Sequence, residues 1–295
     1  MSAGPVTVPA PAKINLFLRI LAREADGFHG LETLFCLVSM ADTVQAERRE
    51  GRGVSIEVEG VDPGPPEQNL AVRAATLVLE ATGHRFGVHL RLNKRIPVRA
   101  GLGGGSSDAA ATLHAVNSLA NGAVPRHELL QLGARLGSDV PFFVTGAPLA
   151  LAWGRGERLF RLPPLPAAPA LLITPAAGVD TAEAYGWLDQ VRGDARRGAV
   201  ALDLDALSRW GDIGRMAGND FESAVFERVP GVRAAFEALA GTRPLVCRLS
   251  GSGSALFAVY RNARDREDAR MMLGRKHGGV HAVETLAAPV PVEMP

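Results

Sequence analysis

The sequence predicts a mixed α+β protein with two domains, on three observations. Apolar segments typical of strands are interspersed with helical patterns, without the regular alternation that predicts a parallel α/β sheet. The length of 295 residues favours two domains. A proline-rich stretch at residues 163–169 is the best boundary, so we expect an N-terminal domain over residues 1–162 and a C-terminal domain over residues 163–295.

The N-terminal domain is expected to begin with a β-rich segment, residues 6–21, whose apolar run is interrupted by Lys13 and Asn15. Alternating apolar residues predict two more strands, and periodic apolar patterns that end at a glycine predict three helices. The strands are expected at residues 54–58 and 88–92, and the helices at residues 70–81, 106–120 and 126–136. Residues 101–105 are too rich in glycine for a helix or a strand.

The C-terminal domain is expected to mix short strands with several helices. A strand at residues 170–173 precedes a helix that Asp180 and Glu183 begin as a capping pair. The other strands are expected at residues 245–249, 255–260 and 280–286, the other helices at residues 202–210, 220–227, 232–240 and 265–276, and an exposed loop at residues 190–200.

Composition excludes several classes of protein. Hydrophobic residues make up 47% and charged residues 21%, which predicts a packed core rather than disorder or a coiled coil. The net charge of +1 argues against a dedicated nucleic-acid binder. No apolar run reaches the ~20 residues that span a bilayer, and the first residues do not resemble a signal peptide. Cys36 and Cys247 lack a CxxC partner, so we expect core thiols in a soluble, cytoplasmic protein.

Residues 97–108 (PVRAGLGGGSSD) lead directly into a predicted helix. Glycines let backbone N–H groups converge, and a helix N-terminus adds unpaired donors and the positive end of a dipole. The segment therefore predicts a phosphate-binding loop rather than a flexible linker. It fits none of the common fingerprints, because no lysine follows the glycines, Ser106 and Asp108 interrupt a dinucleotide pattern, and a protein-kinase His-Arg-Asp loop is absent.

Three motifs in order resemble those of the galactokinase, homoserine kinase, mevalonate kinase and phosphomevalonate kinase superfamily, over nearly the whole chain. They are residues 11–17 (PAKINLF), 97–107 and 249–255 (LSGSGSA). Within this superfamily, four strings resemble the kinases of 4-diphosphocytidyl-2-C-methyl-D-erythritol in the non-mevalonate isoprenoid pathway. These strings are residues 12–16, 26–29 with 31–34, 93–97 and 137–143. One departure is Phe28, where that family usually has tyrosine, so that stacking on a base is kept and a hydroxyl is lost.

The resemblance implies a catalytic pair, Asp139 as the base and Lys13 as its partner. Asp139 lies in an apolar setting that is unfavourable for an unpaired carboxylate, although a helix-capping role is an open alternative. Lys13 would hold Asp139 ionised and stabilise the transferred phosphoryl group; a solvated lysine at the end of a strand is the alternative. Only Lys13, Lys94 and Lys276 are lysines among the 32 basic residues, which favours a specific need for an ammonium group.

The resemblance also assigns the substrate site. His29 would hydrogen-bond the cytosine edge, Phe28 and Tyr185 would stack on its ring, and Asn15 would contact the erythritol or phosphate region. Thr181 would contact the substrate diphosphate, and Gly251 and Gly253 would let the third motif approach phosphates. Each has a plainer alternative: a structural histidine, a core aromatic, a strand-turn residue, a helix cap or a hairpin turn.

The nucleotide site implied by the resemblance begins at residues around the adenine and ribose. Asn69 is one of them, and the N-cap of the following helix is an alternative that could hold together with it. The whole implied set is Asn69, Leu70, Lys94, Pro97, Val98, Arg99, Ala100, Gly101, Leu102, Gly103, Gly104, Gly105, Ser106 and Ser107.

The family implies an N-terminal domain like the second domain of ribosomal protein S5 and a C-terminal ferredoxin-like sandwich, with the active site between them. The expected reaction transfers the γ-phosphoryl group of ATP to the 2-hydroxyl of the substrate, with Mg²⁺ on the triphosphate and no dedicated protein cage for the metal. Two rivals are a homoserine or mevalonate kinase, and a non-catalytic RNA-binding protein on the same N-terminal fold. The sequence does not indicate an oligomeric state.

Overall fold

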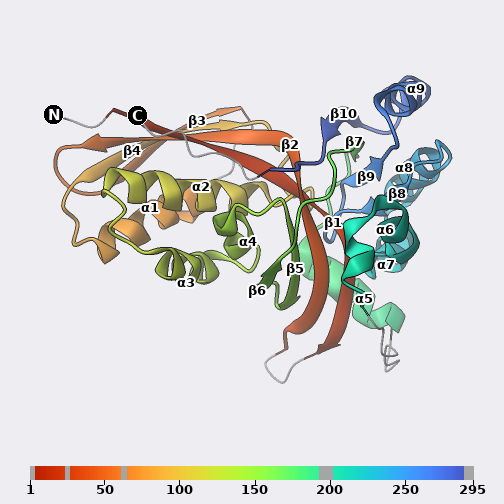
Figure 1. Cartoon of the computed structure of the whole chain (residues 1–295), viewed down its shortest axis with the longest axis horizontal. Helices are drawn as coiled ribbons and strands as arrows, with labels where there is room; N and C mark the ends of the chain where they lie inside the picture. Colours follow the sequence, from red (N-terminus) through yellow and green to blue (C-terminus); the bar gives the residue numbers. More distant parts are fainter. Residues whose placement is uncertain (1–3, 24–26, 61–64, 193–201, 289–295) are drawn as a thin grey trace.

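The computed structural model describes residues 4–23, 27–60, 65–192 and 202–288. Two β-sheets divide the described chain, and helices cover each of them (Figure 1). The strands of the first sheet lie between Val6 and Arg161, and those of the second between Pro169 and Glu284. The mixed α+β class with two sheets is therefore confirmed, and the expected loop at residues 190–200 lies mostly outside the described residues.

The first sheet is built on a long antiparallel ribbon of β1 (Val6–Arg23) and β2 (His29–Arg49). The second half of β2 pairs with β4, and its first half pairs with β5. The strand order is β3-β4-β2-β5-β6, with β1 also on β2. The added strands are β3 (Val54–Gly60), β4 (Gly87–Lys94), β5 (Leu149–Gly154) and β6 (Arg158–Arg161). Figure 1 shows that the ribbon bends between the two halves of the molecule and continues beside α5 (Thr181–Arg192).

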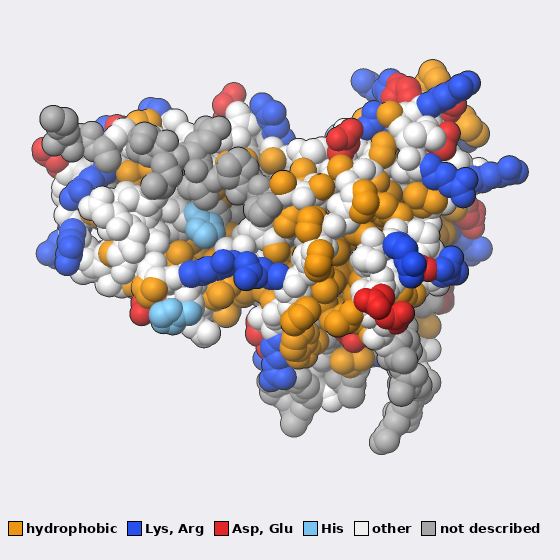
Figure 2. Space-filling view, viewed as in Figure 1, with side chains coloured by type: hydrophobic (Ala, Val, Ile, Leu, Met, Phe, Trp, Pro, Cys, Tyr) orange, Lys and Arg blue, Asp and Glu red, His pale blue; other side chains and the backbone are white. Residues whose placement is uncertain are grey.

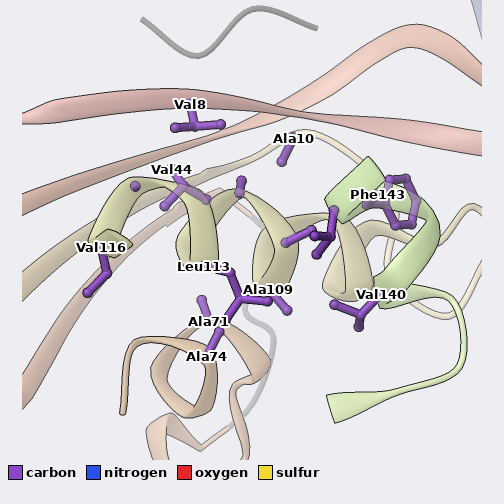
Figure 3. Close-up of a cluster of buried hydrophobic side chains, with 14 of the residues drawn as sticks. Val8, Ala10, Val44, Ala71, Ala74, Ala109, Leu113, Val116, Val140 and Phe143 are labelled. Carbon is purple, nitrogen blue, oxygen red and sulfur yellow. The ribbon is translucent and has the colours of Figure 1, made fainter. Parts of the chain in front are cut away.

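Helix α2 (Gly104–Leu119) is the centre of the N-terminal core. Its small alanines allow close packing against the sheet on one side and α1 (Leu70–Ala81) on the other. Figure 3 shows Ala109 and Leu113 of α2 between Val8 and Val44 of the sheet and Ala71 and Ala74 of α1. The short α4 (Val140–Thr145) packs beside α2, and α3 (Arg126–Leu136) completes the layer. This packing fixes the N-terminus of α2, and with it the glycine-rich loop.

The second sheet has the order β10-β7-β9-β8, with every neighbouring pair antiparallel. Along the chain, helices lie between β7 and β8 and between β9 and β10, whereas β8 leads directly into β9. This is the connectivity of a ferredoxin-like sandwich. This confirms the expected C-terminal fold. The strands are β7 (Pro169–Thr174), β8 (Val246–Leu249), β9 (Leu256–Val259) and β10 (Gly279–Glu284); the helices besides α5 are α6 (Trp210–Met216), α7 (Phe221–Arg228), α8 (Pro230–Ala240) and α9 (Ala263–Leu273).

The two halves share a core. Ala12, Ile14 and Leu16 of β1 belong to one buried cluster with Leu172 of β7 and Phe257 of β9. In Figure 2 hydrophobic side chains gather along the middle of the face, over this junction, while acidic and basic side chains are interspersed around it. In the described part of the chain, no helix is long and apolar enough to cross a membrane.

Several expected elements differ from the structure. The helix expected at residues 202–210 is wrong, since only a 3-10 turn, Asp205–Ser208, and then α6 occur there. Helix α2 begins at Gly104 rather than at Ser106, so that two of the glycines assigned to the loop form its first turn. Strands β2, β5 and β6 and helix α4 were not expected. β2 is buried along its middle, so its sequence lacks the alternation of a half-buried strand.

Candidate active site

Lys13 lies where β1 leaves its regular pairing with β2. The register shifts between Pro11 and Lys13, and again between Asn15 and Phe17. In this interval Lys13 to Asn15 still pair with β2, and the Lys13 backbone N–H also donates to the Leu102 carbonyl of the glycine-rich loop, at 2.9 Å. The irregular stretch explains why a strand of the core carries two polar residues: the Lys13 side chain reaches Asp139, and the Asn15 side chain reaches Gly251 of the third motif.

The Lys13 ammonium is buried and only partly neutralised. Its Nζ donates to Asn15 Oδ1 at 2.7 Å and lies 3.5 Å from Asp139 Oδ2. It also lies 5.3 Å from the centre of the Phe35 ring. Burial lowers the pKa of Lys13, and the charge of Asp139 only partly opposes that effect. The solvated-lysine alternative is therefore wrong.

Asp139 is placed immediately before α4, and its side chain is 30% exposed. It makes no side-chain hydrogen bond to the helix, so the capping alternative is also wrong. A carboxylate that is held beside an ammonium and remains open to solvent is free to accept a proton from a bound hydroxyl group.

Backbone carbonyls of the glycine-rich loop accept hydrogen bonds from the third motif. Ala255 N–H donates to the Ala100 carbonyl at 3.0 Å, and Ser250 Oγ donates to the Gly101 carbonyl at 3.0 Å. Gly101 has φ +75°, and a Cβ built there would lie 2.1 Å from the Ser250 carbonyl oxygen. Glycine is required because any side chain would separate these two loops.

Asn15 and Asn219 hold the third motif in place. Asn15 Oδ1, which also binds Lys13, accepts from Gly251 N–H at 2.9 Å. Asn219 Nδ2 donates to the carbonyls of Leu249 and Gly251, both at 2.8 Å. Asn15 is therefore a link between Lys13 and this loop, and Asn219 is a supporting residue that the sequence analysis missed.

Lys94 lies on the other side of the loop, in a fully buried cluster with Asp42 and Asp108. Its Nζ donates to Asp108 Oδ2 at 2.7 Å and to Asp42 Oδ2. Asp42 Oδ1 accepts from the backbone N–H groups of Arg95 and Ile96, where the loop begins. Burial raises the pKa of Asp108 to about 7, while the two carboxylates raise the pKa of Lys94. Lys94 thus presents its ammonium to the core rather than to solvent.

Two predicted nucleotide residues have defined local roles. Asn69 is the N-cap of α1 and accepts from Ala71 N–H at 2.9 Å, so the helix-cap alternative is correct, and it leaves a nucleotide contact open. Ser107 is 1% exposed, and its hydroxyl has no partner among the described residues. A buried hydroxyl without a partner in the first turns of a helix is suited to a phosphate or a metal ion that is added on binding.

The predicted base-binding residues lie at the far end of the ribbon. His29, at the start of β2, stacks on Tyr185 of α5 with ring centres 5.1 Å apart and binds Asp189 Oδ1 through Nε2 at 2.8 Å. Phe28 is 58% exposed and lies against the Arg155 guanidinium, 4.2 Å from its ring centre. His29 and Tyr185 are thus together, whereas Phe28 lies against Arg155. Asp26, from the same string, lies outside the described residues.

Thr181 connects α5 to the third motif. Its Oγ1 is 3.0 Å from Ser252 Oγ. Tyr185, one turn further along α5, has a pKa raised to about 12, by burial and then by the charge of Asp139. Helix α5 therefore contacts both the third motif, through Thr181, and His29, through Tyr185.

Comparisons with known proteins agree with this arrangement. Residues 69–147 match the GHMP kinases N terminal domain, and residues 201–279 match the GHMP kinases C terminal domain. A 4-diphosphocytidyl-2-C-methyl-D-erythritol kinase of Solibacter usitatus is 42% identical over 263 residues, which are 86% of this chain and 80% of that protein.

Solved structures give the same result. A crystal structure of a 4-(cytidine 5'-diphospho)-2C-methyl-D-erythritol kinase has a TM-score of 0.80 and 35% identity, covering 95% of this chain and 98% of its own. A homoserine kinase from Cytophaga hutchinsonii, with a TM-score of 0.72 and 21% identity over 99% of this chain and 97% of its own, shares the fold. The chain belongs to the 4-diphosphocytidyl-2-C-methyl-D-erythritol kinase family of the GHMP kinases.

Proposed function

We propose that this chain transfers the γ-phosphoryl group of ATP to the 2-hydroxyl of 4-diphosphocytidyl-2-C-methyl-D-erythritol, in the non-mevalonate route to isoprenoid precursors. The products are the 2-phosphate and ADP. One observation carries the chemistry: a buried lysine and a solvent-open carboxylate, 3.5 Å apart, lie against a glycine-rich loop at a helix N-terminus.

Asp139 acts as the general base. As the substrate oxygen attacks the γ-phosphorus, its proton moves to the Asp139 carboxylate, and the bond between the γ-phosphorus and the bridging oxygen of ADP breaks. The Lys13 ammonium stabilises the negative charge on the transferred group. Because burial lowers the pKa of Lys13, the ammonium gains more from an added anion than a solvated lysine would.

The triphosphate would lie on residues 97–107, with its phosphates at the N-terminus of α2, while Asn69 and Leu70 would flank the adenosine. Lys94 was expected beside them, but its ammonium is enclosed by Asp42 and Asp108, so we assign it no contact with the nucleotide. Mg²⁺ neutralises phosphate charge in such reactions. Among the described residues, no group of three or more His, Cys, Asp or Glu side chains is placed to hold a metal ion. Mg²⁺ would be held mainly by the phosphates, and the Ser107 hydroxyl, which has no partner among the described residues, is the side chain that would share it.

The substrate would extend along α5. Asn15, Gly251, Gly253 and Thr181 would contact its phosphate and erythritol end, and His29 with Tyr185 its cytosine, while Phe28 would have to turn from Arg155 to stack on the base. We also place the protein in the cytoplasm, since Cys36 and Cys247 are free and buried, which fits a reducing compartment.

Coupled measurement of ADP release against a panel of acceptors tests the assignment. The panel contains the diphosphocytidyl substrate, its uridine analogue, homoserine and mevalonate. We expect efficient turnover of the first, much weaker turnover of the uridine analogue and none of homoserine or mevalonate. His29→Ala should lower kcat/KM for the diphosphocytidyl substrate about 5–150-fold with the KM for ATP unchanged. Turnover of homoserine or mevalonate instead would leave only the superfamily assignment.

A further inference from the structure

Helix α5 carries three side chains at four-residue spacing, Thr181, Tyr185 and Asp189. Residues four apart lie on the same face of a helix, and here each one makes a separate contact. Thr181 meets Ser252, Tyr185 stacks on His29, and Asp189 binds the His29 ring. Thr181 and Tyr185 have roles in the proposed site, whereas Asp189 has none.

The contact between Asp189 and His29 determines which ring nitrogen carries the proton. Asp189 Oδ1 lies 2.8 Å from His29 Nε2. An ionised carboxylate only accepts hydrogen bonds, so the proton of a neutral imidazole must be on Nε2. Nδ1 then carries a lone pair, and it makes no hydrogen bond within the described residues. The His29 side chain is only 8% exposed, so hydrogen bonds to water have little influence on which ring nitrogen carries the proton.

We infer that Asp189 is a positioning residue that selects the base of the substrate by holding His29 as an acceptor at Nδ1. This inference rests on the proposed function, in which His29 reads the cytosine edge. The exocyclic amino group of cytosine donates a hydrogen bond, which an accepting Nδ1 can satisfy. Uracil places a carbonyl oxygen at the same position, where two acceptors would face each other without a proton between them.

A purely structural role for this contact predicts something different. Asp189 is 40% exposed, and an exposed ion pair contributes little to stability. Its removal would then leave the ring tautomer and the choice of base as they are. The distinguishing quantities are therefore the tautomer of His29 and the ratio of kcat/KM for the cytidine substrate to that for the uridine analogue.

The experiment uses the full-length enzyme and three variants at pH 8, above the ordinary pKa of imidazole. Asp189→Leu removes the acceptor, Asp189→Asn keeps an acceptor oxygen, and Glu183→Leu removes another exposed acid from the same helix as a control. Ring ¹⁵N shifts of His29, assigned by comparison with His29→Ala, report the tautomer in the ligand-free enzyme. We expect Asp189→Leu to lose the single Nε2–H tautomer and to lower the cytidine-to-uridine ratio about tenfold, while the other two variants resemble the parent.

An unchanged tautomer and an unchanged ratio in Asp189→Leu would overturn the inference. So would an equal loss of activity on both substrates with the tautomer unaltered, because that result describes a structural role. A parent enzyme that does not phosphorylate the diphosphocytidyl substrate would overturn the proposed function and, with it, base selection. The two failures are distinguishable, since only the second appears in the parent enzyme.

Discussion

Lys13 and Lys94 lie on opposite sides of the glycine-rich loop, and neighbouring carboxylates balance their buried positive charges to different extents. A Cβ built on Gly103 would lie 3.1 Å from Lys13 Cγ, and one built on Gly104 would lie 3.3 Å from Lys94 Nζ. Lys94 is enclosed with two buried carboxylates. Lys13 is equally buried but has one carboxylate neighbour, at 3.5 Å, which is partly exposed.

This difference in charge balance fits a structural role for Lys94 and the reactive role that we propose for Lys13. Two carboxylates raise the pKa of Lys94, and its hydrogen bonds join the start of the loop to α2. Burial lowers the pKa of Lys13, because its ammonium is removed from water and the charge of Asp139 only partly offsets that loss. An incoming phosphoryl group would supply the missing negative charge. The Lys94 cluster therefore fixes the position of the loop, while the Lys13 pair is kept ready for substrate.

The largest expected effect is on turnover, at the open pair. Asp139→Asn removes the proton acceptor but keeps the shape of the side chain. Losing a positioned general base lowers kcat by about 10²–10⁴-fold, while the affinity for ATP should stay the same because the loop is untouched. Rapid-quench or coupled assays at saturating substrate measure kcat, and calorimetry measures ATP binding.

The neighbouring Ser138→Ala is the control for this variant. Ser138 is exposed and lies beside Asp139 in the chain, so its substitution should leave kcat at the parent value. An Asp139→Asn variant that turns over like the parent would show that Asp139 is not the base.

The same substitution at both lysines tests the comparison directly. Lys94→Met leaves two buried carboxylates with no cation, and removing one partner of a buried ion pair lowers the free energy of unfolding by about 3–5 kcal/mol. Lys13→Met removes a poorly compensated buried charge, so stability should change by less than about 1 kcal/mol, although activity is lost. Urea unfolding of the two variants measures the difference. Equal destabilisation of both would contradict the distinction.

How much of this site could be predicted depends on the kind of residue. Lys13, Asp139 and the glycine-rich loop belong to contiguous motifs, and the structure brings all three together. Scarcity of lysine was a useful signal, since two of the three are buried. The ferredoxin-like half was predicted because the family resemblance covers it, and the short strands and helices support that expectation.

The residues that were missed act across long sequence separations. Asp42 reaches Lys94 from another strand, and Asn219 reaches the third motif from the segment before α7. Single-sequence patterns describe local periodicity and do not show which strands become neighbours. One signal was present: Asp42 follows an apolar run in which an unpaired carboxylate would be unfavourable.

The buried cluster should also give stability a dependence on pH. Burial raises the pKa of Asp108 to about 7, so between roughly pH 4 and pH 7 the folded protein holds a proton that the unfolded chain has released. The contribution of Asp108 to stability therefore falls as pH rises through this window. Asp108→Asn imitates the protonated form and leaves Lys94 paired with Asp42. It should be closest to the parent near pH 4.5, and its advantage in free energy of unfolding should grow by about 3 kcal/mol by pH 8.

Parallel urea titrations at these two pH values measure the difference between the variants. A constant difference between parent and Asp108→Asn at both values would exclude Asp108 as the source of the pH dependence.

The smallest expected effect concerns Gly105, which follows Gly103 and Gly104 in the first turn of α2. Gly104 is a poor test of the loop, because a Cβ there would lie 3.0 Å from Ile96 Cγ2 in the core. A Cβ on Gly105 would meet only Leu70 Cδ1, at an ordinary 3.7 Å, and Gly105 is exposed.

Gly105→Ala should raise the free energy of unfolding by about 0.5–1 kcal/mol, because alanine favours the helix. Its methyl group also occupies the surface that we assign to the phosphates, so the KM for ATP should rise while stability improves. A more stable variant with an unchanged KM for ATP would place the triphosphate elsewhere on the loop.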